Sequence, residues 1–206
     1  GQGTRIRVLS RGVQLQGFTV DGSGGRYDLD DAAVDVEADD ARVEGLRIQR
    51  SVYGVLVQRA RRVTVRRNDI VGSNEATIGL RGDGIRIWET TDSRIEDNDV
   101  RGCRDLVVWY SSGNVVLRNR VDGGRYGTHL MYSHHNRIEG NEYTNDVVGI
   151  FVMYSHDVVI DRNLIANAAG AAGIGCGPKD SGISTARGNG FVHYTVGAYI
   201  DGTPAS

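Results

Sequence analysis

The stretch RYGTHLMYSHHNRIEGNEYTNDVVGIFVMYSHDVVIDRN, residues 125–163, contains nearly the same segment twice. The tetrapeptide Met-Tyr-Ser-His begins at Met131 and again at Met153, 22 residues later. The chain has 2 methionines in all, so both of them lie in this repeat. A fixed repeat of about 20 to 25 residues is typical of solenoid folds, in which each repeat stacks on the next.

An asparagine followed two positions later by an apolar residue recurs along the chain. It occurs, at intervals of 30, 21, 22, 22 and 26 residues, at Asn68, Asn98, Asn119, Asn141, Asn163 and Asn189. Short runs of alternating apolar and polar residues lie between these positions, the pattern of half-buried strands. Asparagine tolerates the left-handed backbone of a tight turn. We therefore predict an all-β protein, a right-handed parallel β-helix with about 22 residues per coil.

The composition agrees with a folded, turn-rich chain. The 206 residues include 29 glycines and 2 prolines, and the net charge of -2 does not favour nucleic acid or an anionic membrane as a partner. No apolar run reaches the ~18 residues of a membrane span. The chain begins without a methionine or a signal peptide, so we expect a fragment of a longer protein. Residues 1–206 are predicted to form one β-helix domain, with loop insertions at about 71–81 and 165–172.

Residues counted back from each asparagine form columns, because successive coils place equivalent residues side by side. Alternate residues of a strand point to opposite sides, and an arginine at position 86 identifies its column as outward. The inward column is predicted to contain Ile87, Val108, Leu130 and Val152. The outward face is predicted to carry an exposed apolar patch made of Trp88, Val107, Trp109, His129, Met131, Phe151 and Met153.

The outward patch contains side chains suited to copper. Methionine thioether and histidine imidazole are ligands typical of Cu(I). His129 and Met131 lie two residues apart on one strand, and Met153 lies one coil away, so we predict these three as metal ligands. His134 and His156, at the corner after the repeat, are the second choice.

The same patch is also typical of a protein contact, because large exposed apolar surfaces usually bind a partner. Its predicted contact residues are Trp88, Val107, Trp109 and Phe151. The ligand and contact interpretations are compatible.

Four segments resemble the NosD family of periplasmic β-helix proteins. They are GDGIRIWETTDSRIEDN (82–98), RYGTHLMYSHHNRIEGN (125–141), VGIFVMYSHDVVIDRN (148–163) and GPKDSGI…GNGFVHYTVGAYIDGTP (177–204). The resemblance covers roughly residues 30–203, and the doubled Met-Tyr-Ser is its most specific part. It departs at Asp105, in a slot that holds glycine in other coils, and near Cys176 and Pro178.

The resemblance implies a non-enzymatic, periplasmic role beside an ABC transporter. A family member of this kind exchanges copper with a copper chaperone lipoprotein and delivers it toward nitrous oxide reductase. The copper, as Cu(I), would be held transiently.

The alternative function is a carbohydrate-active β-helix: a polysaccharide lyase, hydrolase or epimerase, or a sugar-binding module. Such enzymes need carboxylates on neighbouring coils, and Glu139 and Asp161 lie one coil apart. Trp88 and Trp109 would then form a platform for sugar rings. The acids and the tryptophans fall on different strands of the coil, which argues against a shared groove.

The two cysteines are predicted to be free thiols. Cys103 and Cys176 are more than three coils apart, about 15 Å, whereas a disulfide needs Cα atoms within ~7 Å. Cys176 takes an inward position and is expected to be buried. Without a CxxC spacing they are a poor zinc signal.

Overall fold

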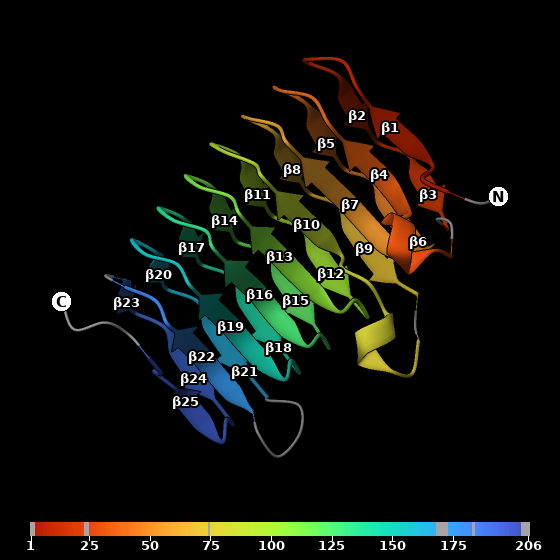
Figure 1. The fold of residues 1–206 in the computed structure, drawn as a ribbon. Coiled ribbons are helices and arrows are strands. Elements are labelled where there is room, and N and C mark those ends of the chain that lie inside the picture. The colour runs from red at the N-terminus through yellow and green to blue at the C-terminus, as the bar shows by residue number, and fades with distance from the viewer. Residues whose placement is uncertain (1–2, 23–24, 74, 168–172, 183, 203–206) are drawn as a thin grey trace.

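The computed structural model describes residues 3–22, 25–73, 75–167, 173–182 and 184–202. Its strands form three parallel sheets, and the chain passes through one strand of each sheet before it starts the next coil. Figure 1 shows the coils stacked from the red N-terminal end to the blue C-terminal end, so the termini lie at opposite ends. The predicted parallel β-helix is confirmed, with about 22 residues in each coil.

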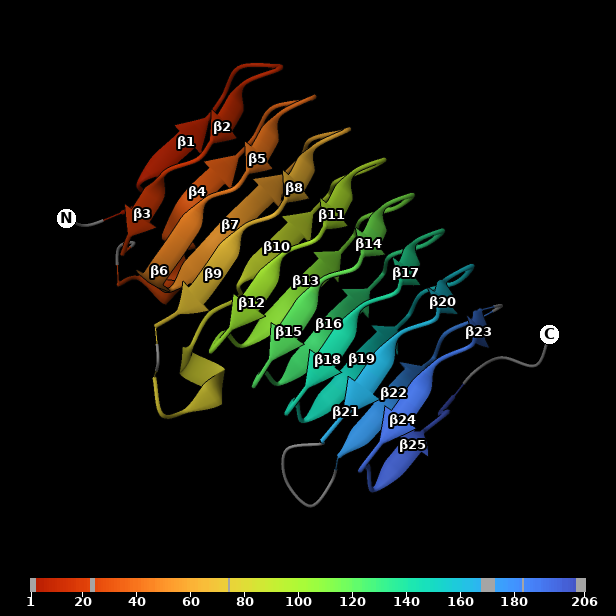
Figure 2. The ribbon, with the colours of Figure 1, turned by 180° about the vertical axis from the view of Figure 1, so that it is seen from behind.

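Each sheet gathers every third strand of the chain. Sheet A contains, in spatial order, β1 (Ile6–Val8), β4 (Ala32–Val36), β7 (Tyr53–Gln58), β10 (Ile85–Trp88), β13 (Asp105–Trp109), β16 (Tyr126–Met131), β19 (Val148–Met153), β22 (Ile174–Lys179) and β25 (Val196–Ala198). Sheet B contains β2 (Gln14–Gln16), β5 (Arg42–Glu44), β8 (Thr64–Arg66), β11 (Arg94–Glu96), β14 (Val115–Leu117), β17 (Arg137–Glu139), β20 (Val159–Asp161) and β23 (Thr185–Arg187). Sheet C, toward the viewer in Figure 2, contains β3 (Thr19–Asp21), β6 (Arg47–Ser51), β9 (Asp69–Gly72), β12 (Asp99–Arg101), β15 (Arg120–Asp122), β18 (Glu142–Thr144), β21 (Leu164–Ala166) and β24 (Gly190–Val192).

The inward face of sheet A is an aliphatic stack. Ile87, Val108, Leu130 and Val152 are successive Cα partners on β10, β13, β16 and β19. At most 1% of each of these residues is exposed. The predicted inward column is therefore confirmed, and it follows from the strand period of two together with a core that accepts apolar side chains.

One corner of the coil carries a ladder of buried asparagines. Asn119 Nδ2 donates to the carbonyl oxygen of Ile95 at 2.8 Å and to Asn141 Oδ1 at 3.0 Å. Asn119 Oδ1 accepts the side-chain N–H of Asn98 at 2.9 Å. The same contacts recur along the ladder to Asn189, which confirms the predicted stack. The left-handed backbone expected at these asparagines is wrong, because it lies one residue earlier, as at Asp97, Arg118 and Gly140. Each asparagine pairs backbone groups that would otherwise be buried without partners.

The tyrosine and serine of the repeated tetrapeptide are explained by the turn after sheet A. Ser133 Oγ accepts the backbone N–H of Ser111 at 3.1 Å and donates to the carbonyl oxygen of Val108 at 2.9 Å. Tyr132 and Tyr154 each have a left-handed backbone with φ of 50°, and their rings stack 4.9 Å apart. Half of the motif thus serves the turn, and the methionine and histidine need another explanation.

Extra residues project from the coil between β9 and β10. This segment carries the short 3-10 helix η2 (Ile78–Leu80), drawn in yellow in Figure 1, so the insertion predicted at about 71–81 is confirmed. Within the second predicted insertion, 165–172, residues 168–172 lie outside the described residues. In the part of the chain that the structure describes, no helix is both long and apolar enough to cross a membrane.

Both cysteines are free and buried, as the prediction of two free thiols requires. Cys103 and Cys176 are each 5% exposed. Burial raises the pKa of each thiol to about 12. Few thiolates therefore form near neutral pH.

Candidate functional site

The two methionines lie side by side on the outer face of sheet A. Trp88 is the Cα partner of Trp109, Trp109 of Met131, and Met131 of Met153. These four residues are partly exposed. The structure therefore brings two thioethers and two indoles into one row across four successive coils.

His129 is buried, although the sequence predicts an exposed position. Only 5% of the residue is exposed, because the rings of Tyr126, Trp109 and Phe151 lie around it at centroid distances of 4.8, 5.6 and 5.9 Å. Val107, also predicted to be exposed, has 0% exposure. The prediction of exposure is wrong for both residues, since large side chains of neighbouring coils cover this part of the outer face.

The imidazole of His129 is neutral and has no hydrogen-bond partner among the residues that the structure describes. Both ring nitrogens are buried, and neither contacts a donor or acceptor among the described residues. Burial lowers the pKa of His129 to about 4, although the charge of Asp105 acts to raise it. A buried polar group without a partner destabilises a fold, and the neutral imidazole is the form that binds metal ions.

The register between β13 and β16 shifts next to Tyr126 and His129. Asp105 of β13 lies beside Tyr126, whereas Val107 lies beside His129, so β16 has one more residue in this interval. A constant register would place Asp105 level with Gly127, as the sequence columns predict. The shift corrects that alignment and explains why the column analysis does not identify Tyr126.

A groove of about 310 Å³ opens beside the methionine row. It is lined by Asp30, Leu56, Gln58, Arg86, Trp88, Trp109, Tyr110 and Met131. Asp30 ends the short 3-10 helix η1 (Tyr27–Leu29). The guanidinium of Arg86 lies 5.3 Å from the Trp109 ring centre and pairs with Asp30 at 3.1 Å. The groove thus has aromatic walls and one arginine, Arg86, whose charge is neutralised by Asp30. Of the three predicted copper ligands, Met131 lines the groove.

A buried charged cluster lies at the start of β10 and β13. Asp83 contacts Arg86 at 2.6 Å and Arg104 at 2.8 Å, and Asp105 pairs with Arg125. Burial raises the pKa of Asp83 to about 7, against the lowering effect of Arg86. This cluster is not evident from the sequence, because its members come from three separate coils. The only signal is an acid just before, or at the start of, a strand.

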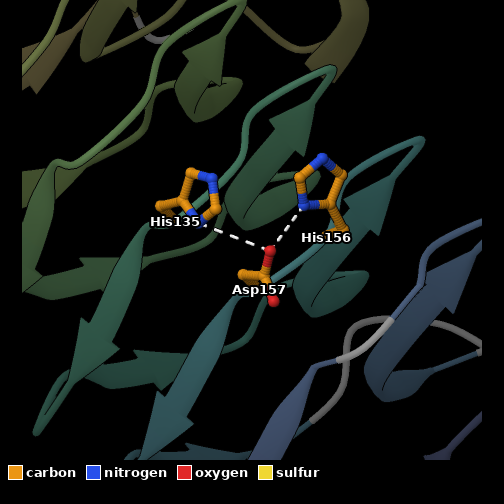
Figure 3. Close-up of side chains that lie close together, drawn as sticks. All are labelled: His135, His156 and Asp157. Atoms are coloured by element: carbon orange, nitrogen blue, oxygen red, sulfur yellow. Dashed lines mark hydrogen bonds and ion pairs between the residues drawn. The ribbon is translucent and has the colours of Figure 1, made fainter.

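Four more polar side chains meet at the corner between sheets A and B. The rings of His134 and His156 stack 3.8 Å apart, which places the second-choice pair together as predicted. His135 and Asp157 join them, and Figure 3 shows the Asp157 carboxylate between the imidazoles of His135 and His156. Asp157 Oδ2 lies 3.4 Å from His135 Nδ1 and 2.7 Å from His156 Nδ1.

Residues 69–203 match the profile of the family described as "Periplasmic copper-binding protein (NosD)". This segment is more than half of the chain. The chain belongs to the NosD family. The methionine row, the imidazole of His129 and the corner histidines all lie inside the NosD segment.

A curated NosD protein is also similar. The "Probable ABC transporter binding protein NosD" of Stutzerimonas stutzeri is 30% identical over 107 residues. The match covers 51% of this chain and 24% of that protein, so it spans about a quarter of the relative's length.

Solved structures share the β-helix fold at low sequence identity. The enzymatically active domain of Bacteriophage CBA120 tailspike protein 2 has a TM-score of 0.69 at 15% identity, over 90% of this chain and 32% of that one. DFA-IIIase from Arthrobacter chlorophenolicus A6 in complex with GF2 has a TM-score of 0.65 at 15% identity, over 89% of this chain and 50% of that one. At this identity the similarity shows the fold alone.

The carboxylate pair considered for carbohydrate chemistry lies on sheet B of this NosD-family chain. Glu139 and Asp161 are Cα partners on β17 and β20. Arg137 lies 2.9 Å from Glu139 and lowers its pKa, and Arg162 lies 2.8 Å from Asp161. A general acid for glycoside hydrolysis needs a raised pKa. The pair therefore gives no support to that chemistry.

Proposed function

We propose that this chain is a non-enzymatic, periplasmic copper-handling component that works with an ABC transporter in the maturation of nitrous oxide reductase. Its cargo is Cu(I), held transiently by His129, Met131 and Met153. One observation carries the proposal: the buried, neutral imidazole of His129, whose nitrogens have no partners among the described residues, lies on the strand that carries Met131.

Two adjacent strands supply the three proposed ligands. His129 and Met131 are two residues apart on β16, so their side chains leave the same side of the sheet. Met153 is the Cα partner of Met131 on β19. Neighbouring strands lie about 4.8 Å apart, a spacing that flexible thioether side chains can close around one ion. Two thioethers and one imidazole form a donor set typical of Cu(I).

The surroundings favour a reversible site. None of the three ligands is charged at pH 7, so a bound Cu(I) keeps its positive charge. The rings of Trp109 and Phe151 exclude water from the imidazole, and an aromatic face attracts a nearby cation by about 0.5–2 kcal/mol. The two cysteines, which would bind copper more tightly as thiolates, lie in the core instead. Such a site suits transfer of copper between partners.

The groove gives a partner access to the proposed copper site. Trp88 and Trp109 line it together with Met131, and Phe151 is partly exposed one coil beyond His129. We assign the partner contact to these three aromatic residues, and Val107, which is fully buried, takes no direct part in it. The proposed partners are a copper chaperone lipoprotein, the ABC transporter subunits and nitrous oxide reductase.

Titration of Cu(I) against a chromophoric competitor tests the proposal. The wild-type chain should bind one Cu(I), and Met131→Ala/Met153→Ala should weaken binding at least tenfold with an unchanged circular dichroism spectrum. His129→Phe keeps an aromatic ring between Tyr126, Trp109 and Phe151 and removes only the imidazole nitrogens. It should weaken Cu(I) binding to the same extent. Glu139→Gln on sheet B is the control and should bind as the wild type does. Unchanged affinity in the double methionine variant would contradict the proposed site.

A further inference from the structure

The turn between sheets A and B has the same backbone in four successive coils. Asp92, Gly113, His135 and Asp157 occupy equivalent positions, with φ between 54° and 70°. The backbone N–H of each of the first three donates to a carbonyl oxygen of the next coil at 3.1 to 3.3 Å. Glycine and aspartate adopt this left-handed backbone more readily than most residues. The turn therefore does not require a histidine at position 135, and its side chain needs another explanation.

The side chains of His135, His156 and Asp157 point toward one another (Figure 3). Their ligand atoms all lie within 4.8 Å of one another, and all three residues are exposed. With bonds of about 2.0–2.1 Å, the ligands of a tetrahedral zinc ion are about 3.3 Å apart. The separation of 3.4 Å between His135 Nδ1 and Asp157 Oδ2 already matches this value. His156 Nδ1 lies 2.7 Å from the same carboxylate oxygen, so both imidazoles face one ligand atom of Asp157.

A neighbouring histidine holds His156 in place. The ring of His134 stacks on that of His156 with an interplanar angle of 15°, and His134 Nδ1 accepts the backbone N–H of His156 at 3.2 Å. Asp157 pairs with two imidazoles, whereas other surface carboxylates, such as Asp40 and Glu142, pair with arginine. The corner thus differs from these ion pairs, because one carboxylate oxygen faces two imidazoles instead of a guanidinium.

We infer that this corner binds a divalent first-row transition-metal ion, with His135, His156 and Asp157 as ligands and water completing the coordination. Imidazole and carboxylate together suit ions such as Zn(II), and the corner lacks the sulfur ligands that favour Cu(I). Full solvent access lets the ion reach the ligands directly. This site goes beyond the proposed function, because it shares no ligand with the methionine row and takes a different class of ion.

Calorimetric titration of the tag-free chain with Zn(II) tests the inference. The wild-type chain should bind one ion, and His135→Ala/His156→Ala should weaken that binding at least tenfold. Asp157→Asn keeps the side-chain shape but removes the anionic ligand, so it should give a loss in the same direction. His193→Ala is the matched control, because His193 is exposed and its Nδ1 lies 3.0 Å from Asn167 Oδ1, away from the corner. All four side chains are exposed, so circular dichroism should show every variant folded.

The outcomes separate this site from the copper site. Met131→Ala/Met153→Ala should retain wild-type Zn(II) affinity, and His135→Ala/His156→Ala should retain wild-type Cu(I) affinity. No saturable Zn(II) binding by the wild-type chain would overturn the inference and leave the corner as a group of side chains in contact. Equal Zn(II) affinity in the double histidine variant, or loss of Cu(I) together with Zn(II), would also overturn it.

Discussion

Met131 on β16 lies directly beside Met153 on β19. Two residues earlier on the same strands, His129 lies beside Phe151. The repeat in the sequence thus builds a row of sulfur next to a row of rings, on the outside of the helix. Because the serine and tyrosine of the repeat serve the turn, its methionines remain for a ligand, and the buried imidazole of His129 lies on the same strand as Met131.

His129 predicts a pH dependence of stability. Its pKa falls from 6.5 to about 4 on folding, so between these values the unfolded chain binds a proton that the folded chain does not. Its contribution to the free energy of unfolding is complete above about pH 6.5 and is lost as the pH falls to about 4. A shift of this size corresponds to about 3 kcal/mol. Urea unfolding of wild type and His129→Phe across this range should show the difference.

The comparison with His129→Phe is needed because other buried groups titrate. Asp83 and Asp146 have raised pKa values, caused by burial, so their contribution to stability falls as the pH rises. That effect is common to both proteins and cancels in the difference. Parallel pH profiles for the two proteins would contradict the assignment of a neutral, buried His129.

The inward stack predicts that Leu130→Asp unfolds the chain. Leu130 has 0% exposure, and an unpaired buried charge costs several kcal/mol, a large part of the total stability of about 5–15 kcal/mol. Met131→Asp, one residue along and on the outer side, should remain folded. Circular dichroism and thermal unfolding check both variants. A folded Leu130→Asp chain would show that the assignment of inward and outward faces is reversed.

The asparagine ladder predicts a graded loss of stability. Asn119→Ala leaves the carbonyl oxygen of Ile95 and the side-chain N–H of Asn98 without their partners, and each unpaired buried group costs about 1–3 kcal/mol. Asn189→Ala, at the partly exposed end of the ladder, should cost less because water replaces the lost contacts. Urea unfolding measures both losses. Equal losses would argue against a role for burial.

The two thiols predict slow chemistry in the folded state. Cys103 and Cys176 are buried, with pKa values raised to about 12, so few thiolates form near neutral pH. Ellman's reagent should therefore detect no rapidly reacting thiol in the native chain and both thiols after unfolding in urea. Rapid reaction of either cysteine in the native chain would show that its coil opens readily.

The coil and its faces follow from local rules that the sequence carries. The asparagine intervals predict the coil length, because each coil must satisfy the same buried turn. A strand period of two predicts that Leu130 is inside and Met131 outside. The coil length and the direction of each side chain can therefore be predicted without knowing which side chains contact one another on the outer face.

The burial of His129 depends on contacts that periodicity does not encode. Tyr126 packs beside the imidazole where the register between β13 and β16 shifts by one residue, and column counting assumes that no such shift occurs. The cluster of Asp83 with Arg86 and Arg104 joins an acid to arginines of its own and the next coil, and the repeat alone does not show that these side chains meet. Packing between columns that are not equivalent therefore has to be observed in the structure.

X-ray absorption at the copper edge tests the central claim most directly. For the wild-type chain loaded with one Cu(I), the account predicts a shell that contains sulfur scatterers and an imidazole nitrogen. Met131→Ala/Met153→Ala should lose the sulfur shell, because these are the only two methionines and both cysteines are buried. A copper shell made only of nitrogen and oxygen, unchanged in the double variant, would contradict the proposed site at His129, Met131 and Met153.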